Sequence, residues 1–134
     1  MATLTQSSNL LKTMLRGNAI FSELSGLTAA LASGAVATFM GLPQGSTLVL
    51  IIIGVVLIGH GMILWFGSGQ TPISPSLAWY AIVGDVGWVL GSLVILYLDP
   101  WSFSTGGWWL FAILADIVAV FAIGQYIGLR RYQI

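Results

Sequence analysis

Four long apolar stretches, separated by short polar breaks, constrain the fold of this 134-residue chain more than any other feature. They cover approximately residues 18–41, 48–67, 76–98 and 106–128. Each has about 20 residues, the length that an α-helix needs to cross ~30 Å of hydrocarbon at a rise of ~1.5 Å per residue. Only 6% of the residues are charged, against about 25% in soluble domains. We therefore expect lipid to surround most of the chain.

The breaks between these stretches carry glycine and proline, which end helices and form turns. They lie at 41–45, 67–75 and 99–105. Because connections this short make consecutive helices antiparallel neighbours, we predict an all-α membrane protein with an up-down-up-down bundle of four transmembrane helices. In this prediction residues 1–134 form a single membrane domain.

The residues before the first apolar stretch, 1–17, are polar and mixed, with leucine and methionine at helical spacing beside Lys12 and Arg16. This pattern is typical of a short interfacial helix that leads into the membrane, and a frayed tail fits the composition equally well. Two basic residues before an apolar run also resemble a signal peptide, with a cleavage motif at 35–37. Because Glu23 interrupts the apolar run, we expect no cleavage.

The basic residues predict the orientation. Lys12 and Arg16 precede the first stretch, Arg130 and Arg131 follow the last one, and no lysine or arginine lies in the connections. With four spans both termini lie on one side of the membrane. The positive-inside rule makes that side the cytoplasm.

Each apolar stretch carries one ionisable side chain, and such groups are costly inside hydrocarbon. Counted from the predicted cytoplasmic ends, these residues lie roughly 8 to 18 Å deep at the helical rise. If they converge, they form a polar site open toward the cytoplasm, with Trp88 as an aromatic wall. The four residues are Glu23, His60, Asp85 and Asp116.

Three interpretations of these residues stay open. They form a pathway or site for a proton, a cation or a small solute, or a pocket for a small amphipathic or cationic ligand beside Trp88. Alternatively they only pack helices, with Asp85 and Asp116 hydrogen-bonded to His60, Trp88, Asn18, Ser22 or Ser25. The first two describe a binding or conducting protein, and the third describes an accessory or scaffold subunit. An enzyme acting on a lipid-soluble substrate is a further alternative, with His60 and Asp85 as its acid–base pair.

Other chemistry has little support in the sequence. The chain has no cysteine, which excludes disulfides, thiolate metal sites and a cysteine nucleophile. His60 is the single histidine, which disfavours haem in a monomer, although a homodimer would supply it twice. The net charge is zero, so no nucleic-acid partner is indicated. We predict no catalytic residues, no metal and no cofactor.

Small residues at a spacing of four form two faces on which helices can approach closely. Such faces pack within one bundle or dock a second copy or another membrane protein. The residues are Gly26, Ala30 and Gly34 in the first stretch, and Gly87 and Gly91 in the third.

Three motifs carry a resemblance: Asn-Ala-x-Phe-Ser at 18–22, Asp-x-x-Trp-Val at 85–89, and Gln-Tyr-x-Gly-Leu-Arg-Arg at 125–131. Together they resemble a widespread group of small four-helix bacterial membrane proteins that has no assigned function. The resemblance implies the same topology and a bacterial inner-membrane location. The chain is also similar to small multidrug transporters in its four helices and its acid, Glu23, in the first of them. It lacks their third-helix pattern and is longer.

Overall fold

The structure, a computed structural model, describes residues 2–133, with side chains from residue 9 onward. Within this range the chain forms five helices and no strand, which confirms the predicted all-α class. The helices are α1 (Ala2–Leu31), α2 (Ser33–Met40), α3 (Ser46–Ser68), α4 (Pro75–Leu98) and α5 (Thr105–Tyr132).

Three of these helices, α3, α4 and α5, are long and apolar enough to cross a membrane. A fourth span is present if Asn9–Leu31 of α1 and Ser33–Met40 of α2 count as one bent element. Residues 2–17 form the first half of α1. They are therefore neither a separate interfacial helix nor a frayed tail, the two alternatives that the sequence allowed. These lengths and compositions are consistent with a multi-pass membrane protein.

The first apolar stretch is not the straight helix that the sequence predicted for 18–41. α1 ends at Leu31, and α2 turns away from it by 92°. The break comes immediately before Ser33 and Gly34, and pairs of glycine and serine are a common cause of sharp kinks. Since no proline marks this position, hydropathy alone did not reveal it.

The start of α5 holds α2 in its bent position. The Ser104 hydroxyl donates to the Phe39 carbonyl at 2.6 Å, and the Ser104 N–H donates to the Met40 carbonyl at 2.9 Å. A Cβ atom on Gly107 would lie only 2.6 Å from the Met40 Cα atom. The end of α2 therefore rests directly on the backbone of the first turn of α5.

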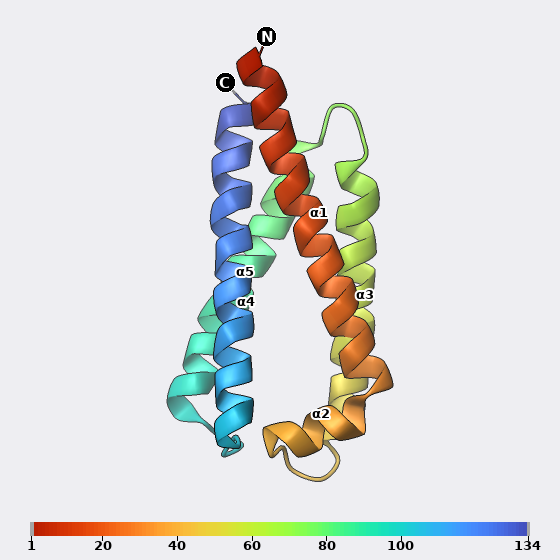
Figure 1. The fold of residues 1–134 in the computed structure, drawn as a ribbon, viewed down its shortest axis with the longest axis vertical. Coiled ribbons are helices and arrows are strands. Elements are labelled where there is room, and N and C mark those ends of the chain that lie inside the picture. Colours follow the sequence, from red (N-terminus) through yellow and green to blue (C-terminus); the bar gives the residue numbers. More distant parts are fainter. Residues whose placement is uncertain (1, 134) are drawn as a thin grey trace.

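The long helices pack in a row in which α1 lies between α3 and α5, and α5 lies between α1 and α4. Helix α1 packs extensively on α3 and on α5, and α4 packs on α5. Although α3 and α4 are consecutive in the chain, they touch at only a few residues. Figure 1 shows consecutive long helices running in opposite directions, with the start of α1 and the end of α5 at the same end. Toward the end where α2 lies, α1 and α3 diverge from α4 and α5 (Figure 1).

The buried apolar core lies at the end where α1 starts and α5 ends, and all four long helices contribute to it. The Tyr132 hydroxyl closes this end by accepting a hydrogen bond from the Ile73 N–H at 3.1 Å. The core residues are Leu11, Leu15, Ala19, Leu64, Ile73, Ala78, Ala81, Ile82 and Leu129.

Small residues bring α1 and α3 into backbone contact. A Cβ atom on Gly26 would lie 2.7 Å from the Gly54 carbonyl oxygen, and one on Gly54 would lie 2.9 Å from the Ala30 Cβ atom. Gly26 and Ala30 thus pack inside the chain. The bend places Gly34 on α2, away from this contact. An added Cβ would meet nothing within 4 Å at the remaining predicted packing glycines, Gly34, Gly87 and Gly91.

Candidate functional site

A closed set of hydrogen bonds joins α1, α4 and α5 at Asp85. Asn18 Nδ2 donates to Asp85 Oδ2 at 2.8 Å and to Gln125 Oε1 at 3.1 Å. Gln125 Nε2 donates to the same Asp85 oxygen at 2.7 Å, and the Ser22 hydroxyl donates to Asn18 Oδ1 at 3.2 Å. All four side chains are buried. We call these four residues the Asp85 cluster.

The members of the Asp85 cluster satisfy one another. Both N–H groups of the Asn18 amide are used, and two amide donors converge on one carboxylate oxygen of Asp85. Hydrogen bonds of this kind between membrane helices contribute about 0.6–1.7 kcal/mol each. Among the side chains that the structure describes, no second ionisable group bonds to Asp85. The geometry therefore favours a structural role for this carboxylate.

Of the partners that the sequence suggested for Asp85, Asn18 bonds to it directly. Ser22 bonds to Asn18 instead, and His60, Ser25 and Trp88 make no hydrogen bond to Asp85 in the described part of the chain.

The sequence did not predict Gln125 as a partner. Gln125 lies close to the C-terminal end of the last apolar stretch. An amide at this position is expected to face water, so it did not indicate a buried site. Its spacing to Val118 and Ala122, at seven and three residues, is the signal that was available, since residues at this spacing share one helix face. Both residues are buried on that face of α5.

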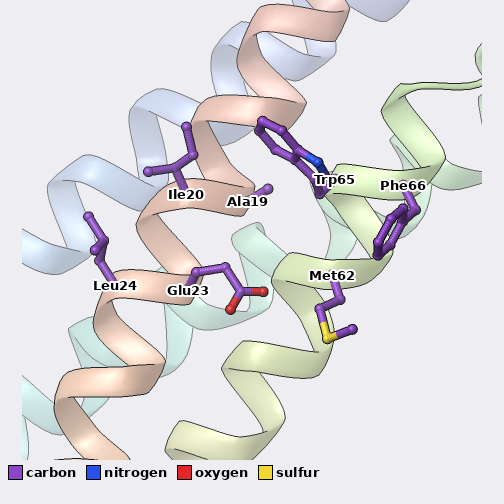
Figure 2. A pocket seen from close by; sticks show the side chains of 7 residues that line it. All are labelled: Ala19, Ile20, Glu23, Leu24, Met62, Trp65 and Phe66. Atoms are coloured by element: carbon purple, nitrogen blue, oxygen red, sulfur yellow. The ribbon is translucent and has the colours of Figure 1, made fainter.

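Glu23 lies outside the Asp85 cluster, in a groove between α1 and α3. Figure 2 shows its carboxylate pointing from α1 toward α3, between apolar side chains of both helices. The Oε1 atom of Glu23 is buried, and no residue in the described part of the chain hydrogen-bonds to it. The groove has a volume of about 330 Å³ and is lined by Ala19, Ile20, Glu23, Leu24, Met62, Trp65 and Phe66.

Gly61 of α3 makes room for the Glu23 carboxylate. A Cβ atom on Gly61 would lie 2.7 Å from Glu23 Oε1 and 2.9 Å from the Ala19 carbonyl oxygen. Both distances are too short for a real side-chain contact, so any larger residue here displaces the carboxylate or moves α1. The notch at Gly61 therefore determines where the Glu23 oxygen lies.

Arg16 packs on Trp65 at the end of the groove nearer the termini. Its guanidinium carbon lies 4.6 Å from the Trp65 ring centre, within the range of a cation–π contact. Arg16 and Glu23 are seven residues apart, or about 10 Å along α1 at the helical rise. No hydrogen bond from Arg16 reaches the buried Glu23 oxygen. The groove thus has a cation at one end and an unpaired carboxylate oxygen along its wall.

His60 and Trp88 do not join the Asp85 cluster. His60 Nδ1 lies 2.9 Å from the Tyr80 hydroxyl, in a hydrogen bond that links α3 to α4. Trp88 is 37% exposed and is not a wall of the groove. The acid–base pair of His60 and Asp85 that a membrane enzyme was expected to use is not formed, because each residue is hydrogen-bonded elsewhere.

Asp116 is also separate, since its side chain is exposed on the outer face of α5. It lies nine residues before Gln125, which places it about 14 Å along the helix from the Asp85 cluster. The expected convergence of Glu23, His60, Asp85 and Asp116 is therefore absent from the structure. The sequence predicted the position of each residue along its helix but not the direction in which its side chain points. Within residues 9–133, no three histidine or acidic side chains lie close enough together to hold a metal ion.

Comparison with known proteins adds no further candidate. The chain matches no protein-family model, no curated protein and no solved structure. A functional assignment therefore depends on the geometry of its own side chains.

Proposed function

We propose that this protein crosses a bacterial inner membrane four times and binds a lipophilic cation in the groove at Glu23. In this proposal the bent pair of α1 and α2 is the first span, and the four spans are antiparallel. Asn9–Leu31 alone is about 34 Å long at the helical rise, enough to cross the hydrocarbon. The basic residues at the start of α1 and the end of α5 support cytoplasmic termini.

The proposed topology is tested by labelling single cysteines, because the chain has none of its own. We expect Gln44→Cys, between α2 and α3, to react with a membrane-impermeant maleimide added to intact spheroplasts. We expect Gln70→Cys, between α3 and α4, to react only after lysis. Labelling of Gln70→Cys in intact spheroplasts without labelling of Gln44→Cys would reverse the orientation.

The buried Oε1 atom of Glu23 carries the binding proposal. A carboxylate oxygen without a partner is costly in a low-dielectric environment. A ligand that supplies a positive charge or a hydrogen-bond donor therefore gains more binding free energy from this oxygen than it would from a carboxylate in water. The other carboxylate in the interior, Asp85, already accepts two hydrogen bonds. Glu23 is therefore the carboxylate in the interior that is free to bind something else.

The walls of the groove select the kind of cation. Five lining side chains are more than one-third exposed on the outer surface of the helices: Ile20, Leu24, Met62, Trp65 and Phe66. A ligand that reaches the groove from the bilayer must therefore itself be apolar. Aromatic rings favour cations at close range, and a volume of about 330 Å³ is at the lower end of the range for small-molecule sites. A compact organic cation with apolar substituents satisfies all three conditions.

Binding of tetraphenylphosphonium to the purified protein in nanodiscs tests this proposal. We expect the wild-type protein to bind this cation, and Glu23→Gln to bind it at least about tenfold more weakly, because the counter-charge is lost. Asp116→Asn, which removes a carboxylate outside the groove, is the matched control and should bind like the wild type. Equal binding to the wild type and Glu23→Gln, or equal binding of neutral triphenylphosphine oxide, would exclude the proposal.

A second candidate, an accessory subunit without a ligand, is favoured by the Asp85 cluster alone. Its four side chains hydrogen-bond to one another, as expected for side chains that only pack helices. The same titration separates the two candidates. An accessory subunit predicts no saturable binding of tetraphenylphosphonium and no effect of Glu23→Gln.

A further inference from the structure

Asp116 stands exposed on α5 without a partner in the described part of the chain. It lies 11 residues after the start of α5 at Thr105, which is about 16 Å along the helix and close to half the thickness of the hydrocarbon. An ionisable side chain at this depth almost always faces protein or a water-filled cavity. The exposed surface around Asp116 is therefore expected to be covered by protein in the membrane.

The residues beside Asp116 have the spacing of a coiled-coil contact. Intervals of four and three residues alternate along this face, which is the heptad pattern that keeps one helix against a parallel partner. The apolar members are between 40% and 62% exposed. We call this surface the α5 seam, and it consists of Trp109, Ile113, Asp116, Val120, Ile123 and Ile127.

A second copy of the chain supplies both a parallel partner helix for the α5 seam and a polar group at the depth of Asp116. Two copies in one membrane have the same orientation, so their α5 helices are parallel and a two-fold axis along the membrane normal brings each residue opposite itself. Asp116 then meets a carboxyl group at its own depth. Two carboxyl groups at one site pair by sharing a proton, the protonated one donating to the other.

No basic residue of a second copy offers a better pairing. The four lysine and arginine residues lie in the first half of α1 or in the last turn of α5, away from the depth of Asp116. Arg130 continues the spacing of the α5 seam in this last turn, where water screens its charge from the same residue of a second copy.

We propose that the α5 seam is the interface of a parallel homodimer in which Asp116 hydrogen-bonds to Asp116 of the partner subunit. This proposal depends on the membrane location but not on ligand binding, because the groove lies on α1 and α3. Loss of tetraphenylphosphonium binding in Glu23→Gln and loss of the dimer are thus separate results.

Cysteine crosslinking in native membranes tests the geometry. Under mild oxidation we expect Ile113→Cys and Val120→Cys to form disulfide-linked dimers in high yield. Val55→Cys is the matched control, since it is an exposed valine on α3 and should stay monomeric. Monomeric seam variants, or a control that crosslinks as readily, would overturn the proposal.

Energy transfer between labelled copies in vesicles then tests the role of Asp116. We expect Asp116→Leu to raise the dimer dissociation constant roughly three- to thirtyfold, the range for one polar contact between membrane helices. Asp116→Asn keeps a donor and an acceptor and should dimerise like the wild type. An Asp116→Leu variant that dimerises as tightly as the wild type overturns the pairing, and so does a wild-type protein that stays monomeric without other proteins.

Discussion

Replacing Gly54 with alanine is expected to destabilise the protein by about 1–3 kcal/mol, the usual cost of an extra group in a packed interior. The new Cβ atom would lie 2.6 Å from the Gly26 carbonyl oxygen and 2.7 Å from the Ala30 nitrogen. Both are backbone atoms that cannot rotate away. The two helices must separate, so we expect the cost at the upper end of this range.

Gly59→Ala is the matched control for this substitution. Gly59 lies on the same helix, and a Cβ atom there would meet nothing within 4 Å. Its expected effect is neutral or slightly stabilising, because alanine has a higher helix propensity than glycine by about 1 kcal/mol. Unfolding in mixed micelles with increasing dodecyl sulfate measures both variants. Similar losses in both would show that the contact between α1 and α3 is not as close as the structure has it.

Replacing Asp85 with leucine is expected to have an effect of similar size. It removes the acceptor of two buried amide hydrogen bonds, from Asn18 and from Gln125. At about 0.6–1.7 kcal/mol for each interhelical hydrogen bond, the loss of unfolding free energy is about 1–3 kcal/mol. The donors left behind cannot reach water, since both side chains are buried.

Asp85→Asn removes the negative charge of the side chain but keeps an oxygen that accepts hydrogen bonds. The amide oxygen of the new side chain can still accept from both donors, so we expect it to lose less than half of the stability that Asp85→Leu loses. The same unfolding titration measures the pair. If Asp85→Leu unfolds like the wild type, the Asp85 cluster does not tie the helices together. If Asp85→Asn is the less stable variant, the carboxylate does more than accept these two bonds.

Hydropathy and turn residues were sufficient to locate three of the helices. The apolar stretches at 48–67, 76–98 and 106–128 agree with α3, α4 and α5 to within a few residues at each end. Their ends are local features, such as Pro75 in the first turn of α4 and the Ser104 hydroxyl that accepts from the Gly107 N–H. Local chemistry of this kind can be recognised without knowledge of the rest of the fold.

The bend before α2 could not be predicted in the same way. Ser33 and Gly34 are small residues that a straight membrane helix also tolerates. The bent form is selected by contacts with a distant part of the chain, the hydrogen bonds from Ser104 to the end of α2. The small residues Ser33 and Gly34 permit the bend and the tertiary contacts select it, so the predicted single helix over 18–41 was wrong.

The sequence thus shows which residues are costly to bury in a membrane. Only the tertiary structure shows what each of them contacts. Glu23, Asp85 and Asp116 stand out in any reading of so apolar a sequence. Helices that are apolar all round give little indication of which face turns inward, and one residue changes the direction of a side chain by about 100°. The rotation of each helix, decided by glycine contacts and buried amides, therefore placed these carboxylates in three different surroundings: a groove, a closed cluster and an open face.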